Sequence, residues 1–237
     1  MPQNEEEEHV GLLHVFKVLY TYKPFVLNTV YILFYGIINL SLLTCLTYYC
    51  TYVLGSADDV TLLEALYLVA SLVSTLFVSK IDAAIGRKKT MLLGGFFFVV
   101  GKLWFIINPL STPALYVNCV TTGVAVAITF VMFNTNRNNL SDLVEWREGR
   151  RMDGMIGTAD NLSTKLGEAL AAQLLTNMLA RAGYNADLAV QPDAAINAIN
   201  AMLGIVPAIF GALIIVVVLF LNIDTEMEKM KQSRAEH

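Results

Sequence analysis

Two charged residues lie close together in an apolar part of the sequence that is long enough to cross a membrane. They are Lys165 and Glu168, in the segment DNLSTKLGEALAAQLL that begins at Asp160. Together with Asn161 and Ala172 they recur at positions i, i+4, i+7 and i+11, which form one face of a helix. The spacing therefore predicts an amide, an amine and a carboxylate on a single helical stripe.

Such a stripe is unfavourable in lipid, because a charged side chain near the bilayer centre costs at least about 2.5–3.5 kcal/mol. Lys165 lies about twelve residues inside its predicted helix, or roughly 18 Å at about 1.5 Å per residue, which is close to mid-membrane. Two interpretations remain open. The stripe lines an aqueous cavity that binds solute, or Lys165 and Glu168 neutralise each other within the fold.

A second polar stripe lies in the first long apolar segment, where Asn28, Tyr31, Tyr35 and Asn39 follow helical spacing. Amides and phenols suit the recognition of sugar hydroxyls, and they suit hydrogen bonds between helices equally well. Both roles stay open, and the four residues are candidates for the cavity wall.

Other residues of the apolar segments receive structural interpretations. Lys102 lies nearer to a membrane surface, so we expect its amine to snorkel towards water. Asn134 and Asn136 are expected to cap a helix or to bond between helices. The segment around Lys165 also has a stripe of small residues that favours close packing on a neighbouring helix, namely Ser163, Gly167 and Ala171.

The composition indicates a membrane protein. Of the 237 residues 56% are hydrophobic and only 15% are charged, whereas a soluble domain has about 25% charged residues. The three cysteines form no CxxC or Cys/His cluster, so neither a metal site nor a disulfide framework is predicted. We see no set of nucleophile, base and orienting residue, and therefore expect no enzyme, no cofactor and no nucleic-acid partner.

Six segments have the length and apolarity of spanning helices, so we predict an all-α membrane protein with six transmembrane helices in one bundle. Their expected limits are 25–53, 61–80, 90–108, 113–136, 153–180 and 196–222. Residues 1–24 are expected to be an acidic cytoplasmic lead-in with an interfacial helix. Residues 25–222 form the bundle, and residues 223–237 form a cytoplasmic tail.

The basic residues predict the orientation. Thirteen of the 16 lysines and arginines fall on one side of the predicted spans, and excess positive charge marks the cytoplasmic side. Both termini are therefore expected in the cytoplasm, and the location is expected to be the bacterial inner membrane.

One connection on this side, KIDAAIGRKK, resembles a loop motif of the major facilitator superfamily. Asp82 could pair with Arg87 and Lys88 in one conformational state and separate from them in another, as a gating latch.

A longer stretch resembles the glycoside-pentoside-hexuronide:cation symporters, the group of melibiose permease, within the same superfamily. The resemblance covers residues 12–225, corresponds to the C-terminal six of twelve helices, and is carried by Asp142, Glu145-Trp146-Arg147, Gly149, Arg150-Arg151, Asp153-Gly154, Lys165 with Gly167, and Gly183-Tyr184. An acidic residue that is frequent upstream of Asp142 in that family corresponds to Asn139 here.

The resemblance implies several roles. Lys165 is expected to face a central cavity near the sugar and cation sites, while Asp142, Glu145 and Arg151 are expected to take part in cytoplasmic gating. A coupling cation, Na⁺ or H⁺, would have its main ligands in the other half of such a symporter.

The implied function is the C-terminal half of a sugar:cation symporter that works by alternating access with a second six-helix bundle. Two alternatives stay open. One is a half-size transporter in which two copies pair, and the other is a membrane scaffold that does not transport. The expected partners are membrane lipid, an N-terminal six-helix half or a second copy, and a small sugar-type solute.

Overall fold

The computed structural model describes residues 19–188 and 190–235, which are almost entirely helical. The long helices are α2 (Lys23–Tyr49), α3 (Asp59–Ile85), α4 (Arg87–Ile107), α5 (Thr112–Glu148) and α6 (Asp153–Arg181). A π-helical turn, η1 (Cys50–Leu54), extends α2, and the chain ends with α7 (Asp193–Leu203), α8 (Ile205–Phe220) and α9 (Ile223–Ala235). The described residues contain no strand, so the predicted all-α class is confirmed.

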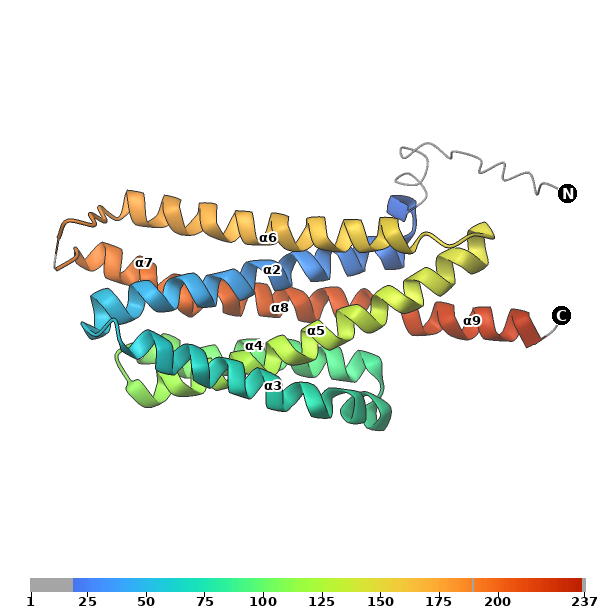
Figure 1. The fold of residues 1–237 in the computed structure, drawn as a ribbon, viewed down its shortest axis with the longest axis horizontal. Helices are drawn as coiled ribbons and strands as arrows, with labels where there is room; N and C mark the ends of the chain where they lie inside the picture. Colours follow the sequence, from blue (N-terminus) through green and yellow to red (C-terminus); the bar gives the residue numbers. More distant parts are fainter. Residues whose placement is uncertain (1–18, 189, 236–237) are drawn as a thin grey trace, which may run out of the picture.

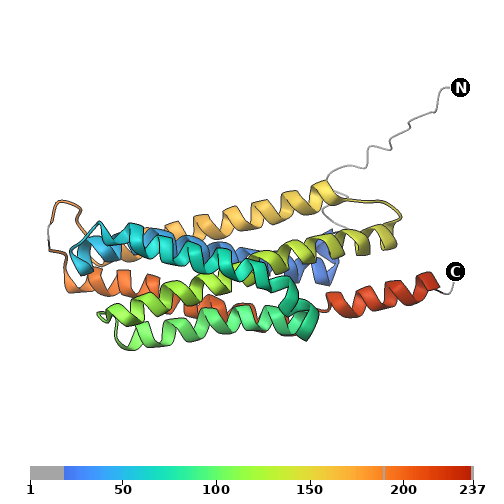
Figure 2. The same cartoon turned by 60° about the horizontal axis from the view of Figure 1, so that its bottom comes forward.

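The helices form one elongated bundle whose spatial order differs from the order in the sequence (Figure 1, Figure 2). α6 packs along α2, α2 along α8, α8 along α4, α4 along α5, and α5 along α3. α3 and α6 are thus the outer members of this series, and each has a wide exposed surface. α9 extends beyond the bundle, at the end where α2 and α4 begin (Figure 1).

Local sequence signals set several helix ends. Pro24 occupies the first turn of α2, where its missing N–H leaves no hydrogen bond unmade. Ser111 caps α5 by accepting a hydrogen bond from the Ala114 amide. Gly86 and Gly149 have φ values of +84° and +73°, which few other residues tolerate, and they end α3 and α5.

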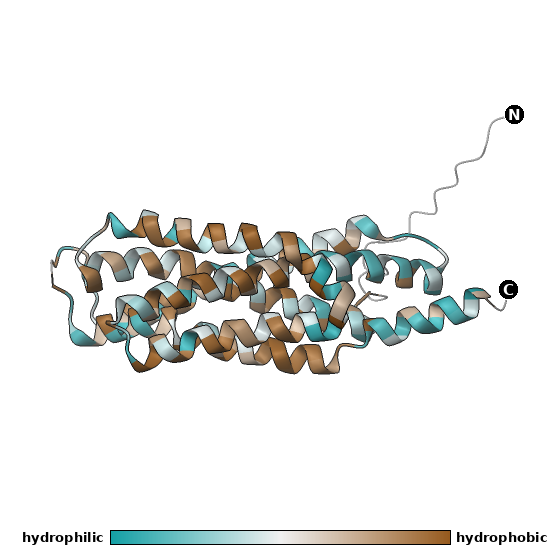
Figure 3. Ribbon diagram, turned by 90° about the horizontal axis from the view of Figure 1, so that it is seen from below, coloured by the Kyte–Doolittle hydropathy of each residue, from teal (hydrophilic) through white to brown (hydrophobic). Residues whose placement is uncertain are grey.

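Five helical stretches are long and apolar enough to cross a membrane: Lys23–Leu54, Asp59–Ile85, Arg87–Ile107, Thr112–Glu148 and Asp193–Ala235. The 29-residue α6 lies beside them in the bundle but is more polar. Hydrophobic residues fill the middle of the bundle, and hydrophilic residues gather towards its C-terminal end (Figure 3). The predicted six-helix arrangement therefore holds, with α6 as an unusually polar member.

Two expected connections are largely helical. The fourth span was expected to end at residue 136, but α5 continues to Glu148 and includes the whole segment NTNRNNLSDLVEWRE. Arg137, which lies just beyond the expected limit at residue 136, is therefore inside a helix. The second span likewise continues to Ile85, so that only Gly86 separates α3 from α4.

The last span is broken in two, which the sequence analysis did not predict. α7 ends at Leu203 and α8 begins at Ile205, with Gly204 between them. Pro207 has no N–H to bond the Leu203 carbonyl four residues earlier, which weakens the helix at this point. The Asn118 amide of α5 takes its place and donates to that carbonyl at 3.5 Å.

The seam between α2 and α6 confirms the predicted role of the small residues. Ser163, Gly167 and Ala171 are buried, and a Cβ added at Gly167 would lie 2.2 Å from the Leu33 carbonyl oxygen. A Cβ at Gly36 would lie 2.5 Å from the Thr164 carbonyl oxygen. The two backbones can approach this closely only because both positions are glycine.

The predictions for the two ends of the chain can be compared with the structure to different extents. The predicted acidic lead-in and most of the interfacial helix lie outside the described residues, which begin at Leu19. The predicted tail after residue 222 is helical, and it forms α9.

Candidate functional site

The polar stripe on α6 is exposed at the middle of the bundle. The Lys165 ammonium donates to the Glu168 carboxylate at 2.7 Å, and the two side chains are 76% and 24% exposed. Asn161 and Ala172 are exposed on the same stripe. Lys165 follows the start of α6 by twelve residues and precedes its end by sixteen, so the pair lies about midway along the helix.

α6 has three distinct faces because its packing and exposed residues follow helical spacing. The small-residue face lies against α2, and the polar stripe lies on one side of it. Leu162, Leu166 and Leu170, each about half exposed, form an apolar stripe on the other side. The polar and the apolar stripes are therefore separate surfaces, which is the arrangement required of a helix with lipid on one side and a polar environment on the other.

The stripe on α2 faces into the bundle instead. Asn28 accepts a hydrogen bond from Asn136 of α5 at 3.0 Å, and Tyr31 is completely buried. Asn39 accepts from the Tyr67 hydroxyl of α3 at 3.0 Å. These contacts are hydrogen bonds between helices, one of the two roles that the sequence left open.

Tyr35 lies where α2 meets α5, and Asn39 lies where α2 meets α3. Tyr35 is 7% exposed, and its ring lies 5.7 Å from that of Phe133 on α5. Asn39 is partly exposed, in contrast to Asn28 and Tyr31. The structure thus separates the α2 candidates into a closed pair and a pair nearer to the surface.

The expectation that Lys102 snorkels is wrong, because its side chain is completely buried. Its ammonium donates to the Asn118 amide oxygen and, at 2.7 Å, to the Thr122 hydroxyl. None of the ion pairs found in the described part of the chain involves Lys102. Polar groups of α5 solvate the amine inside the bundle, so it has no need to reach water.

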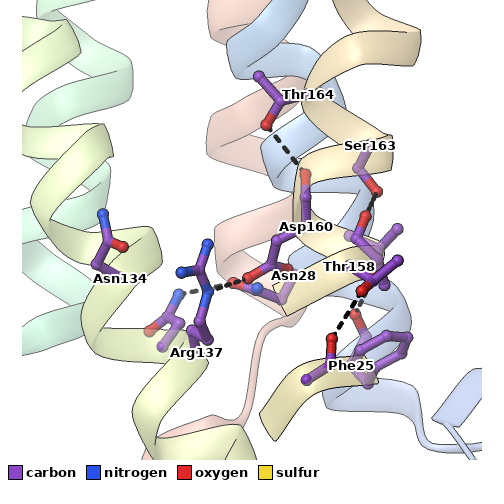
Figure 4. Close-up of polar contacts among 12 residues, drawn as sticks. Phe25, Asn28, Asn134, Arg137, Thr158, Asp160, Ser163 and Thr164 are labelled. Atoms are coloured by element: carbon purple, nitrogen blue, oxygen red, sulfur yellow. Dashed lines mark hydrogen bonds and ion pairs between the residues drawn. The ribbon is translucent and has the colours of Figure 1, made fainter. Parts of the chain in front are cut away.

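A buried ion pair between α5 and α6 was missed by the sequence analysis. Figure 4 shows Arg137 and Asp160 in contact. Arg137 Nε donates to Asp160 Oδ2 at 2.7 Å, and Asp160 is only 1% exposed. The sequence shows a charged residue at each position, but Arg137 lies just beyond the expected end of the fourth span, and Asp160 was given no role. Asn134, drawn in the same view, bonds its own helix at the Phe130 carbonyl.

At the end that carries α9, the candidate latch residues have other partners. Arg87 pairs with Asp224 of α9 at 3.3 Å, and Lys88 donates to the Leu219 carbonyl at 2.7 Å. Asp82 contributes its backbone carbonyl to the Gly86 amide, while its Oδ1 is buried without a partner. In this conformation the structure does not bring Asp82 together with Arg87 or Lys88.

Arg87 also lies close to Asn139, the position at which the symporters that this sequence resembles frequently have an acidic residue. With the Asn139 amide oriented so that its oxygen faces α4, that oxygen accepts hydrogen bonds from both terminal nitrogens of Arg87. A neutral amide therefore receives the guanidinium here, and the only carboxylate paired with it among the described residues is Asp224.

The remaining gating candidates do come together. Arg151 lies 3.7 Å from Asp142, 3.8 Å from Glu145 and 3.2 Å from Asp153, so one guanidinium bridges the end of α5 and the start of α6. All four side chains are at least a third exposed, and such pairs can exchange partners at little cost.

Tyr22 adds an aromatic contact at this end, just before α2. Its ring lies 4.4 Å from the Arg147 guanidinium. Burial, with a further contribution from the Glu226 carboxylate, raises the pKa of Tyr22 from 10.0 to about 12, while Arg147 opposes the shift.

No group of three His, Cys, Asp or Glu residues that could hold a metal ion occurs in the part of the chain that the structure describes. The three cysteines are buried and unpaired, and a buried thiol packs as a small hydrophobic group.

Comparison with known proteins gives a consistent result. Residues 1–225 match the family described as MFS/sugar transport protein. The uncharacterized symporter YjmB of Bacillus subtilis is 26% identical over 94% of this chain and 48% of its own length. The glucuronide carrier protein homolog of Escherichia coli is 27% identical over 73% of this chain and 38% of its own.

The isoprimeverose transporter of Lactiplantibacillus pentosus is 29% identical over 62% of this chain and 31% of its own length. The chain thus spans about half the length, or less, of these three relatives. They are transporters and not enzymes, and the family resemblance inferred from residues 142–184 is confirmed. The chain is an integral membrane protein and belongs to the MFS/sugar transport protein family.

Proposed function

We propose that this six-helix bundle forms one wall of the solute cavity of a cation-coupled sugar symporter, and that a second six-helix bundle forms the opposite wall. Solute would bind between the bundles and be exposed to each side of the membrane in turn as they rock. The second bundle can belong to the same polypeptide, to a separate subunit or to a second copy.

One observation carries this proposal. α6 exposes an ammonium, a carboxylate and an amide midway along its length, on a face separate from its exposed leucines. Facing lipid, these groups would be strongly unfavourable. Facing a polar cavity, they would be hydrated and available to solute hydroxyl groups. Pairing of Lys165 with Glu168 makes the stripe nearly neutral, and this suits an uncharged sugar.

The names of the relatives support a sugar-type solute, since one is an isoprimeverose transporter and another a glucuronide carrier homolog. Among the candidates from α2, Tyr35 and Asn39 are better placed for solute than Asn28 and Tyr31, which are fully buried. The main ligands for a coupling Na⁺ or H⁺ are expected in the opposite bundle.

The clustering of basic side chains at one end supports placing that end, and with it both termini, in the cytoplasm of a bacterial cell. The Arg151 cluster with Asp142 and Glu145 would then lie at the cytoplasmic mouth of the cavity. There it could loosen as the bundles rock, together with the contacts of Arg87 and Lys88. Asp82 would exchange onto this basic group in the other state.

The test is uptake of labelled glycosides, pentosides and uronides by cells that express this chain together with the N-terminal half of a relative. Lys165→Ala is expected to reduce coupled uptake at least tenfold, and Lys165→Arg to restore part of it. Leu166→Ala is the matched control, because Leu166 is the next residue and lies on the apolar face. Full coupled uptake by both Lys165 variants would remove the proposed role.

Accessibility provides a second measurement. Because Cys45, Cys50 and Cys119 are buried, single cysteines can be introduced without removing them. Lys165→Cys should react with a membrane-impermeant maleimide and be protected by bound solute, whereas Leu166→Cys should not react. Uptake by this chain expressed alone would identify a second copy as the opposite wall.

A further inference from the structure

The Arg137–Asp160 pair contains an unsatisfied atom. Oδ2 of Asp160 accepts from Arg137 Nε at 2.7 Å, but Oδ1 is buried and has no hydrogen-bond partner. Asp160 is 1% exposed, so bulk water does not solvate this oxygen. A buried carboxylate oxygen without a donor is strongly unfavourable, and such groups are rare in native proteins, so this one calls for an explanation.

The surroundings of Asp160 favour a proton over a metal ion. The charged group in contact with it is Arg137 from α5, and no group of three His, Cys, Asp or Glu side chains that could hold a metal ion occurs among the described residues. α2, which packs along α6, has no charged residue except Lys23 at its start, and its buried Tyr31 is neutral. On α6 itself the nearest charge is Lys165, which is already paired with Glu168.

The α5 side of the junction contains a free acceptor. Asn136, the residue before Arg137, donates through its Nδ2 to Asn28, while its Oδ1 is buried without a partner. Three fully buried side chains at this junction of α2, α5 and α6 thus each carry one unpartnered polar atom, namely Asn28 Nδ2, Asn136 Oδ1 and Asp160 Oδ1.

Arg137 also connects this junction to the candidate cavity. Its side chain is 31% exposed, and its guanidinium lies 5.7 Å from the centre of the Phe133 ring. Phe133 in turn packs against Tyr35 at 5.7 Å. A change in the position of Arg137 would therefore reach a residue proposed to border the solute.

We propose that Asp160 is a proton-binding carboxylate of this bundle, and that protonation of Oδ1 weakens its bond to Arg137 and frees the guanidinium. The step adds one proton to an oxygen lone pair, so the charge of the pair changes from zero to +1. The ion pair forms when the proton leaves, and the bundle then regains its closed α5–α6 contact. The proposed transport function is assumed for the coupling role, but not for the proton binding.

Proton binding is measured on the purified full chain by infrared difference spectroscopy during an acid titration. The wild type should gain the carbonyl stretch of a buried protonated carboxylic acid, and Asp160→Asn should lack it. Asp58→Asn, in an exposed turn at the far end of the bundle, is the control and should leave the band unchanged. A band of equal size in Asp160→Asn overturns the proposal.

Arg137→Gln provides a second variant in case Asp160→Asn folds poorly. Without its cation the carboxylate should hold its proton to higher pH, so the band should persist over a wider pH range. An unchanged titration in Arg137→Gln also overturns the proposal.

Coupling is measured as the pH dependence of uptake in the assembled transporter. Asp160→Asn should flatten the pH profile while exchange of solute across the membrane continues, and Asp160→Glu should restore it. A purely structural ion pair would lower stability in Asp160→Asn and leave the profile as in the wild type, which overturns the coupling role. If the wild type moves no solute, the proposed function fails, and the infrared result still decides the proton site.

Discussion

Lys102 and Lys165 both lie inside segments that were predicted to span the membrane, and their environments are opposite. Lys102 on α4 is completely buried and donates to an amide and a hydroxyl of α5. Lys165 on α6 is 76% exposed and pairs with a carboxylate on its own helix. From the sequence we expected the first to snorkel outwards and the second to border a cavity or to be neutralised internally.

The difference shows what decides whether a lysine side chain in a membrane helix is buried or exposed. Lys102 faces a neighbouring helix that offers Asn118 and Thr122, so the protein replaces water as its solvent. Lys165 has no such neighbour, because α6 is an outer helix that packs on α2 through a different face. A structural lysine and a functional candidate are therefore distinguished by their helix neighbours rather than by their depth in the span.

The largest expected effect on this comparison comes from a substitution that moves α6 away from α2. Gly167→Val places a Cβ 2.2 Å from the Leu33 carbonyl oxygen, a backbone atom that cannot yield as a side chain can. We expect a loss of more than about 3 kcal/mol in unfolding free energy, and loss of uptake, while the Lys102 contacts remain. The measurement is thermal unfolding in detergent, followed by tryptophan fluorescence.

Gly157→Ala is the control for this variant, since an added Cβ on the same helix meets nothing within 4 Å. It should be neutral or stabilise by up to about 1 kcal/mol, because alanine favours helix more than glycine does. Equal stability of Gly167→Val and the wild type would contradict the close α2–α6 packing.

The next effect concerns the buried lysine. Lys102→Ala removes two hydrogen bonds and opens a cavity beside Asn118, so we expect a loss of about 2–3 kcal/mol in unfolding free energy. Lys102→Met keeps the volume and avoids burying an ammonium, so its loss should be about 1 kcal/mol or less. Denaturant titration of both variants separates packing from charge, and a larger loss for the methionine variant would contradict this account.

The exposed lysine should behave in the opposite way. Lys165→Ala breaks a mostly exposed i,i+3 pair, so its effect on unfolding free energy should be within about 1 kcal/mol, even though coupled uptake is expected to fall at least tenfold. The same unfolding assay provides the measurement. A stability loss as large as that of Lys102→Ala would show that Lys165 is structural and would erase the distinction between the two lysines.

The last effect lies at the end of the bundle, away from both lysines, and is a pH dependence that appears only at alkaline pH. The pKa of Tyr22 is raised to about 12 in the folded protein, mainly by burial, and is about 10 in the unfolded chain. Between these values the unfolded state loses its proton first, so stability should fall as pH rises from 10 to 12.

Tyr22→Phe should make this fall less steep, by at most about 1.4 kcal/mol per pH unit. Unfolding midpoints measured from pH 9 to 12 test the expectation. The same pH dependence in both proteins would show that the Tyr22 hydroxyl is not protected from ionisation.

Much of the fold follows from local pattern. Runs of about 20 apolar residues predict the helices, and Pro24 and Gly86 lie at two of their ends. The small residues at 163, 167 and 171 predict a close helix contact, and the packing against Leu33 and Gly36 confirms it. The boundary at residue 136 was wrong, because the polar run after it forms an amphipathic extension of α5 instead of a loop.

The site was predicted less completely. Arg137 and Asp160 are 23 residues apart on different helices, and no spacing rule links them. Asn28 was correctly placed on a polar stripe, but its partner Asn136 lies on a helix that is adjacent only in space. The latch group was predicted from a local motif, whereas Arg87 takes its carboxylate from α9, far along the chain.

The amino-acid sequence by itself determined the helices, their apolarity, the small-residue seam on α6 and the family to which the chain belongs, because each depends on residue types at short spacing. Only the tertiary structure decided which polar groups lie together inside the bundle, namely Lys102 with Asn118 and Arg137 with Asp160. It also decided that Lys165 is exposed at the surface. The physical reason is that a hydrogen bond or ion pair depends on the distance between atoms, and helix order in space is not helix order in the chain.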